Sequence, residues 1–227
     1  MSGDALTREQ IVKAAIELLD EQGLEGLNMR ALGKRLGSVP TAVYWHLKSK
    51  RDLVTLAGDH VWDEIALPDL TRSDWRTAAT TVATDFRAML TRHPWLVQVF
   101  GSYLVYGPKR ARHDDHSLAL FEAAGFVGAS ALQAAATVGT FVLGSVLGAA
   151  GQAAMKRALR RGGDSAALIR ERITKASAIA RQFPRLRAHL ERTTSARTAP
   201  DASFEFGLRA VLDGLEARLV SHRKARA

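Results

Sequence analysis

Apolar residues recur every three to four positions along most of the chain, and no stretch sustains a strict alternation of apolar and polar residues. The first pattern is typical of helices that bury one face, whereas alternation is typical of half-buried strands. Proline and glycine interrupt the helical pattern at intervals, so the helical runs follow one another with short breaks. The pattern therefore predicts an all-α fold.

A pair of short helical runs lies near the N-terminus, within residues 27–53. They follow a first helix that begins at Thr7-x-x-Gln10, a spacing typical of a capping box. Gly37 ends the first run of the pair, and Pro40 opens the second. Two short helices joined by a turn that contains glycine indicate a helix-turn-helix motif.

The local charge supports a nucleic-acid role for this pair. Residues 29–51 contain six Lys or Arg side chains and no Asp or Glu. Such an excess of cations favours contacts with phosphates, because each neutralised phosphate releases counterions. The aromatic run Tyr44-Trp45-His46 adds groups that can hydrogen bond or pack in a groove. The alternative is a small amphipathic helix pair with a solvated basic face.

Further helical runs follow this pair along the rest of the chain. Gly23 is expected to close the first helix, and Ser49 with Asp52 is expected to cap a helix that continues to about Ala66. A cap at Ser73 is expected to begin the helix after that. The later predicted helices cover residues 73–92, 95–105, 109–124, a segment ending near 181, and 203–219.

The stretch from Ala123 to Met155 holds 33 residues without a charge. Its length alone would suffice for a membrane span. Its bulk is Ala and Gly, it contains several polar residues, and Gly144-x-x-x-Gly148 allows two helices to approach closely. We therefore interpret it as a buried helix at a subunit contact, with a membrane-anchored protein as the alternative.

Residues 156–197 hold twelve Lys or Arg and three acidic residues. A second nucleic-acid surface is one interpretation of this excess. A solvated connection between helices, with a joint at Gly162-Gly163, is the interpretation we favour.

Composition narrows the class of protein. The chain has 227 residues, a formal net charge of +9 and no cysteine. A basic balance favours a polyanionic partner, and the lack of cysteine is compatible with a reducing cytosol. The N-terminal residues do not resemble a signal peptide, so a cytoplasmic protein without membrane attachment is expected.

The sequence shows no Gly-rich phosphate loop and no recognisable catalytic motif, so no catalytic residue, no cofactor and no enzyme activity are predicted. His113 and His116 have a spacing that two metal ligands on a helix can use. No further ligand accompanies them, and an exposed helix start explains the pair, so no metal site is predicted.

The N-terminal 60 or so residues resemble the DNA-binding domain of the TetR (tetracycline repressor) family. The matching pieces are LTREQIVKAAIELLDEQGLEGLNMRALGKRLG and VYWHLKSKRDLV. The order Ser38-Val39 after the turn glycine and Met29 in place of a small hydroxyl residue depart from the family pattern. The resemblance implies a helix-turn-helix domain over residues 1–48 and a helical effector-binding and dimerisation domain over 49–227.

The same resemblance implies the DNA contacts. In that family the second of the two short helices, here called the reading helix, enters the major groove. Pro40 and Thr41 are expected to face bases. Phosphate contacts are expected from other side chains of the reading helix and from the helix before it. The predicted DNA-binding residues are Arg30, Pro40, Thr41, Ala42, Tyr44, Trp45, His46, Lys48 and Lys50.

The resemblance also implies a homodimer, formed through a four-helix bundle of two late helices from each subunit. We expect the helix around Gly144 and Gly148 and the last helix, through Leu208 and Leu212, to form this interface. We therefore predict a transcriptional repressor that binds a palindromic double-stranded DNA operator and is released by a small-molecule effector. Aromatic residues in the second domain are candidates for an effector pocket. The predicted ligand-binding residues are His60, Phe86, Met89, Phe100, Tyr103 and Phe141. The alternative is a helical ligand carrier or enzyme with a vestigial helix-turn-helix.

Overall fold

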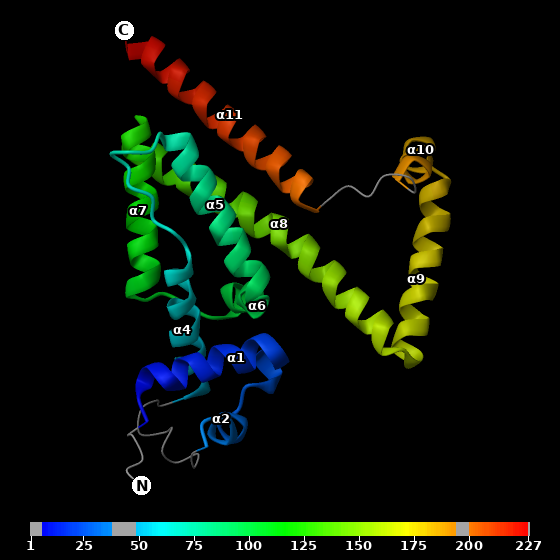
Figure 1. The fold of residues 1–227 in the computed structure, drawn as a ribbon. Helices are drawn as coiled ribbons and strands as arrows, with labels where there is room; N and C mark the ends of the chain where they lie inside the picture. The colour runs from blue at the N-terminus through cyan, green and yellow to red at the C-terminus, as the bar shows by residue number, and fades with distance from the viewer. Residues whose placement is uncertain (1–5, 38–48, 194–199, 227) are drawn as a thin grey trace.

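The computed structural model describes residues 6–37, 49–193 and 200–226, and every regular element in these ranges is helical, which confirms the all-α prediction. The N-terminal helices lie at one end of the molecule, and α5, α7, α8 and α11 form the main body (Figure 1). The helices are α1 (Arg8–Gly26), α2 (Met29–Arg35), α4 (Lys50–His60), the 3₁₀ turn η1 (Val61–Glu64), α5 (Trp75–Arg92), α6 (Trp95–Ser102), α7 (Pro108–Ala124), α8 (Ala129–Arg161), α9 (Gly163–Arg181), α10 (Pro184–Thr193) and α11 (Pro200–Arg226).

Local capping contacts confirm where two helices begin. The Thr7 hydroxyl accepts a hydrogen bond from the Gln10 amide at 3.2 Å, and the Gln10 side-chain oxygen accepts one from the Thr7 amide at 2.8 Å. The Ser49 hydroxyl likewise accepts from the Asp52 amide at 3.1 Å. Each cap satisfies an amide that has no partner inside its helix.

Gly23 was expected to close the first helix, and the structure confirms that the helix breaks there. Its φ of 72° produces a kink, after which helical turns continue to Gly26. Gly37, with φ of 60°, ends α2 as predicted. Side chains rarely adopt this left-handed backbone, so both positions favour glycine.

Three predicted boundaries also shift. The helix expected to reach Ala66 ends at His60 and tightens into η1, which brings Val61, Trp62 and Ile65 all into the core. The cap of α5 is Asp74 rather than Ser73. The helix expected to reach residue 105 ends at Ser102. Packing against neighbouring helices decides such ends, because the local pattern does not distinguish one turn from the next.

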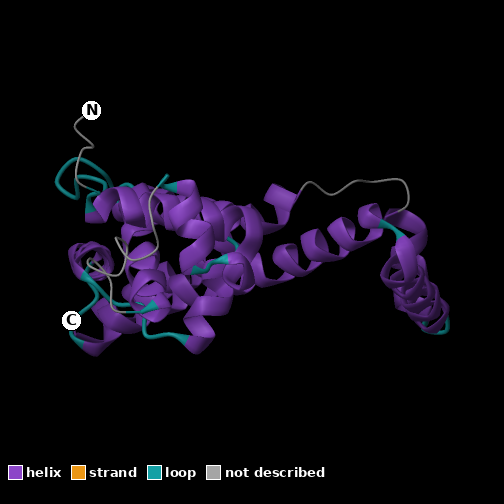
Figure 2. Cartoon of the chain, turned by 90° about the horizontal axis from the view of Figure 1, so that it is seen from below, coloured by secondary structure: helices purple, strands orange, loops and turns teal. Residues whose placement is uncertain are grey.

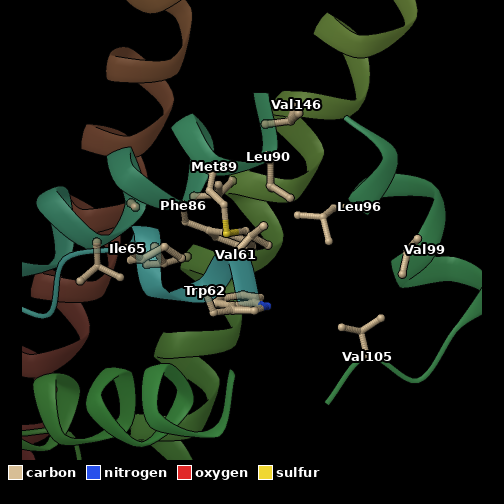
Figure 3. Packing of buried hydrophobic residues seen from close by; sticks show 14 of the residues in the cluster. Val61, Trp62, Ile65, Phe86, Met89, Leu90, Leu96, Val99, Val105 and Val146 are labelled. Atoms are coloured by element: carbon tan, nitrogen blue, oxygen red, sulfur yellow. The ribbon is translucent and has the colours of Figure 1, made fainter. Parts of the chain in front are cut away.

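One continuous apolar core joins the N-terminal helices to the main body. It runs from Leu18 and Leu53 in the N-terminal helices to Val61 and Trp62, and on to the main body. Figure 3 shows Trp62 below Phe86, and the two ring centroids are 5.2 Å apart. The end of α4 is therefore packed into the body, and side-chain contacts connect the two.

Helix α8 has one buried and one exposed face. Val138, Val142 and Val146 are buried against the neighbouring helices. The segment Ala129–Gly148 is also long and apolar enough to cross a membrane, judged by length and composition alone. The exposed stripe consists of Gln133, Ala136, Thr137, Thr140, Gly144, Leu147 and Gly148.

Helix α11 packs its leucines inward. We had expected Leu208 and Leu212 to form the subunit interface, but both are buried within the single chain. Gly207 allows this close approach, because a Cβ atom there would lie 2.6 Å from the Phe141 ring of α8. Phe206, which is 78% exposed, faces the opposite side of α11.

Helices α9 and α10 stand apart from the rest of the molecule (Figures 1 and 2). The predicted joint is confirmed, since Gly162 and Gly163 have φ angles of 74° and 73° between α8 and α9. This arm carries exposed apolar residues as well as its many cations. A solvated connection between helices stays our interpretation of this segment, with a second nucleic-acid surface as the alternative.

Candidate functional site

The N-terminal helices hold two of the predicted DNA-binding residues in described positions. Arg30 is exposed on α2, and Lys50 opens α4 with its ammonium donating to the Leu24 carbonyl at 2.7 Å. An ammonium has three donors, so this contact leaves Lys50 able to meet a phosphate. The other seven, Pro40, Thr41, Ala42, Tyr44, Trp45, His46 and Lys48, lie outside the described residues.

Arg35 illustrates a cation that the fold has already neutralised. Its guanidinium forms ion pairs with Glu17, at 3.2 Å, and with Glu21 of α1. Arg30 and Lys34 form no ion pair within the ranges that the structure describes. The positive surface offered by α2 therefore comes from Arg30 and Lys34.

A cavity of about 1000 Å³ lies in the main body between η1, α5, α7 and α8. Of the predicted ligand-binding residues, Phe86, Phe100 and Tyr103 line it. Its volume is at the upper end of the range of about 300–1,000 Å³ that is usual for small-molecule sites. The cavity is thus large enough for a drug-sized compound.

The other three predicted ligand-binding residues do not line this cavity. Met89 is almost fully buried in the core, and Phe141 stacks on Phe204 of α11 with 5.6 Å between ring centroids. The His60 imidazole lies 3.1 Å from the Lys109 ammonium. Burial, and then the charge of Lys109, lower the pKa of His60. All three belong to packing between helices in the described structure.

The wall residues that the sequence analysis missed include Trp62, Arg110 and His113. We had interpreted His113 only as a possible metal ligand at an exposed helix start, but it is 8% exposed. The signal was available, because His113 begins an inward stripe that continues through Leu120 and Ala124 at helical spacing. Within the described residues, no group of three or more His, Cys, Asp or Glu could hold a metal ion.

Arg110 joins the polar and aromatic parts of the wall. Its guanidinium lies 4.1 Å from the centroid of the Trp62 ring and donates through Nε to the Asp114 carboxylate at 2.8 Å and 3.0 Å. Burial raises the pKa of Asp114, but hydrogen bonds and charges from His113 and Arg110 outweigh burial and lower it. Asp114 is therefore ionised at neutral pH and balances the charge of Arg110.

The first turn of α7 is held by α4. The buried Asp59 carboxylate accepts hydrogen bonds from the backbone amides of Arg110, at 2.9 Å, and Lys109, at 3.4 Å. Gly107 makes room for it, because a Cβ atom there would lie 2.4 Å from the carboxyl carbon. The turn that carries Arg110 into the cavity wall is thus capped by the helix that leads to the N-terminal domain.

A second polar link joins α1 to the body. The buried His93 imidazole places Nδ1 2.7 Å from Asp20 of α1 and Nε2 2.9 Å from Glu64 of η1. Trp95 donates to the same Asp20 oxygen at 2.8 Å. Burial lowers the pKa of His93, but the hydrogen bonds and charges of the two carboxylates outweigh burial and raise it.

This pKa shift predicts a pH-dependent stability. A group whose pKa is raised by folding contributes fully below its unfolded value, about 6.5, and loses that contribution as pH rises through the folded value. We expect the free energy of unfolding, measured by urea titration, to fall as the pH rises above about 6.5. His93→Gln should cost about 1–3 kcal/mol at pH 6 and flatten this dependence. An equal fall in the wild type and in His93→Gln would disprove the role of His93.

Comparison with known protein families assigns residues 11–56 to the model for bacterial regulatory proteins of the tetR family. Residues 67–219 match the model for the tetracyclin repressor-like C-terminal domain. The two matches cover the helix-turn-helix region and the helical body, so both parts of the chain agree with the same family.

Individual relatives agree with these matches. The chain is 38% identical over 141 residues to an HTH-type transcriptional regulator of Saccharopolyspora erythraea, a match that spans 62% of this chain and 60% of that protein. It is 31% identical to the HTH-type transcriptional repressor DrrR1 of Streptomyces coeruleorubidus, over 96% of this chain and 80% of that protein. The crystal structure of the TetR family protein ActR from Streptomyces coelicolor in complex with actinorhodin superposes with a TM-score of 0.73 at 25% identity, covering 95% of this chain and 97% of that one.

Proposed function

The chain belongs to the TetR family of bacterial transcriptional regulators, and on that premise we propose that it is a homodimeric repressor released from its operator by a small molecule. The observation that carries this proposal is the cavity of about 1000 Å³ whose wall is attached directly to α4. The similarity to the repressor DrrR1 supports the repressor role, and the similarity to ActR in complex with actinorhodin supports binding of a small molecule.

We assign DNA binding to residues 1–48 and effector binding with dimerisation to residues 49–227. One short reading helix contacts few base pairs, so two copies on a palindrome, with half-sites about 34–36 Å apart or a multiple of this, are needed for specificity. The nine predicted DNA-binding residues remain our candidates for the operator contacts. A regulator of this kind would act in the cytoplasm, without membrane attachment.

The exposed stripe of α8 supports the homodimer. It holds no charged residue, and exposed apolar residues such as Leu147 and, on α11, Phe206 would be covered by a second copy. An uncharged face that carries exposed apolar residues is typical of an interaction site. The stripe is also rich in small residues, which allow two helices to approach closely.

Two sets of contacts would transmit the effect of ligand binding from the body to the DNA-binding helices. The Asp59 cap joins α4 to the first turn of α7, and the His93 cluster joins α1 to η1 and the start of α6. A ligand that binds more tightly to the arrangement with displaced reading helices lowers the affinity for the operator. A difference of about 1–3 kcal/mol in ligand binding between the two arrangements lowers operator affinity roughly 5- to 150-fold. Movement of Arg110 by the ligand is the simplest start of that path.

The test is to select an operator from random duplexes and then screen small molecules for its release. Repeating the screen with Phe86→Trp and Tyr103→Trp fills the cavity with larger side chains. We expect ligands that release wild-type protein to act much more weakly on both variants. A ligand that releases all three proteins equally would place the effector site elsewhere, and failure to select any operator would disprove the repressor role.

Arg30 allows a sharper test of the DNA-binding surface. We expect Arg30→Ala to weaken binding to all duplexes and to reduce the slope of log affinity against log salt concentration by about one, because one phosphate contact is lost. Arg172→Ala removes an exposed cation of α9 and is the matched control. Equal salt slopes for the wild type and Arg30→Ala would rule out the phosphate contact.

A further inference from the structure

A buried histidine lies where the N-terminal helices meet the main body. His93 directly follows α5, is 3% exposed, and faces Asp20 of α1 and Glu64 of η1. Helix α1 packs both against α2 and against α6 of the body (Figure 1). The polar contact at His93 therefore joins the body to the helix that supports the helix-turn-helix.

Both ring nitrogens of His93 face carboxylate oxygens. Nδ1 lies 2.7 Å from Asp20, and Nε2 lies 2.9 Å from Glu64. An ionised carboxylate only accepts hydrogen bonds, and an imidazole donates from both nitrogens only when it is protonated. The neutral ring would donate to one carboxylate and turn a lone pair toward the other. The contact between α1 and η1 is thus complete only when His93 carries a positive charge.

The two carboxylates also have other donors. The Trp95 indole donates to the same Asp20 oxygen at 2.8 Å, and Arg92 forms an ion pair with Glu64. Each carboxylate therefore keeps one partner when His93 is neutral, which avoids the cost of an unpaired and partly buried charge. Loss of the proton would weaken the link between α1 and the body without unfolding the protein.

The charged groups that face His93, among the described residues, come from three elements. They are the two carboxylates, on α1 and η1, and Arg92 in the last turn of α5. Helix α6, which begins beside them, carries no charged residue. The neighbouring acids of α1, Glu17 and Glu21, pair with Arg35 of α2 instead. Two negative groups and one positive group around His93 favour its charged form.

The protonation of His93 changes with pH in a known direction. Burial lowers the pKa of His93, but the hydrogen bonds and charges of the two carboxylates outweigh burial and raise it. The proton is therefore lost above the ordinary value of about 6.5. The link between α1 and the body is complete in mildly acidic solution and becomes incomplete as the pH rises.

Resting on the proposed operator binding, we propose that His93 is a proton-controlled latch between α1 and the body, and that affinity for the operator falls as the imidazole becomes neutral. With the ring charged, α1 is tied to η1, and the two reading helices of a dimer keep a fixed separation. With the ring neutral, α1 moves more freely, and operator binding has to restrict that movement again, which lowers affinity. A rise in pH would thus favour release of the operator without any effector.

The test follows operator affinity and the proton of His93 in the same protein. Fluorescence anisotropy with the selected operator duplex gives the affinity at a series of pH values and one salt concentration. NMR of the imidazole ring reports when His93 loses its proton. We expect wild-type affinity to fall roughly tenfold as the ring becomes neutral, because one hydrogen bond to a charged group is lost.

Three variants isolate the latch. His93→Gln can donate to only one of the two carboxylates, so it should bind the operator weakly at every pH. Asp20→Asn presents an amide that can donate to the neutral ring and an oxygen that still accepts from Trp95, so its affinity should no longer fall. Glu25→Gln removes an exposed carboxylate from the same helix and should titrate as the wild type does. Every other histidine, including His46, is present in all four proteins, so the differences report His93.

Hydrogen exchange tests the docking of α1 in the absence of DNA. Protection of α1 relative to α7 should fall in the wild type as His93 becomes neutral, and should not change with pH in Asp20→Asn. Unchanged protection of α1 across the titration of His93 would overturn the inference, whether or not an operator is known.

The outcomes with DNA separate this inference from the proposed function. A constant wild-type affinity across the titration of His93, or an equal fall in the wild type, His93→Gln and Asp20→Asn, would overturn the latch and leave operator binding intact. Failure to select any operator would contradict the repressor role instead, and hydrogen exchange would then decide whether the proton controls the docking of α1.

Discussion

Gly144→Arg is expected to convert the proposed dimer into monomers and to weaken operator binding by roughly 10²- to 10⁴-fold, because the two half-sites would no longer be bound by one linked pair. Gly144 is exposed on α8, and a Cβ atom there would meet no atom within 4 Å in the single chain. An arginine therefore leaves the monomer fold intact but places a charge in an uncharged helix contact. Sedimentation velocity and operator titration on the same sample provide the measurement.

Gly101→Arg is the matched control, since Gly101 is also an exposed helical glycine with open space beside it. It should remain dimeric and bind the operator normally. Leu212→Glu, in contrast, should unfold the body rather than separate subunits, because Leu212 is buried within the chain. An unaltered dimer in Gly144→Arg would exclude the α8 stripe as the subunit contact.

Asp59→Ala is expected to uncouple ligand binding from operator release. The variant leaves the amides of Lys109 and Arg110 without their cap, so movement of the α7 turn no longer displaces α4. If this cap carries the coupling, the ratio of operator affinities without and with ligand should fall from the 5- to 150-fold range to near one. Loss of the cap should also cost about 1–2 kcal/mol of stability.

The measurement is an operator titration with and without a compound that the release screen identifies. Asp59→Asn retains a side-chain oxygen that can cap α7 and should preserve most of the response. Gly107→Ala should resemble Asp59→Ala, because its methyl group would collide with the carboxylate. A full response in Asp59→Ala, with ligand affinity unchanged, would show that the coupling runs through another contact.

Some parts of the fold were predictable because they depend on neighbours in the sequence. The caps at Thr7 and Ser49 each involve a residue three positions away, and the left-handed turn at Gly37 needs only a glycine. Helical periodicity was sufficient for the all-α class. The family resemblance rested on the same local pieces, and the matches to both family models confirm it.

The cavity was only partly predictable. Aromatic residues in the second domain could be recognised as candidates, and Phe86, Phe100 and Tyr103 do line it. Nothing in the local pattern separated them from Met89 or Phe141, because a buried aromatic or methionine has the same helical spacing in a core as in a pocket wall. The difference is whether a facing helix fills the space, and that depends on residues far apart in the sequence.

The sequence by itself determined the helical class, the helix-turn-helix with its basic surface, the main breaks between helices and the uncharged character of residues 123–155. Each follows from residue type and short-range spacing. The tertiary structure alone decided that His93 lies between Asp20 and Glu64, that Asp59 caps α7, and that Trp62 and His113 lie side by side on the wall of one cavity. These pairs are separated by 29 to 73 positions for the His93 contacts and by about 50 for the others, and only the packing of whole helices brings them together.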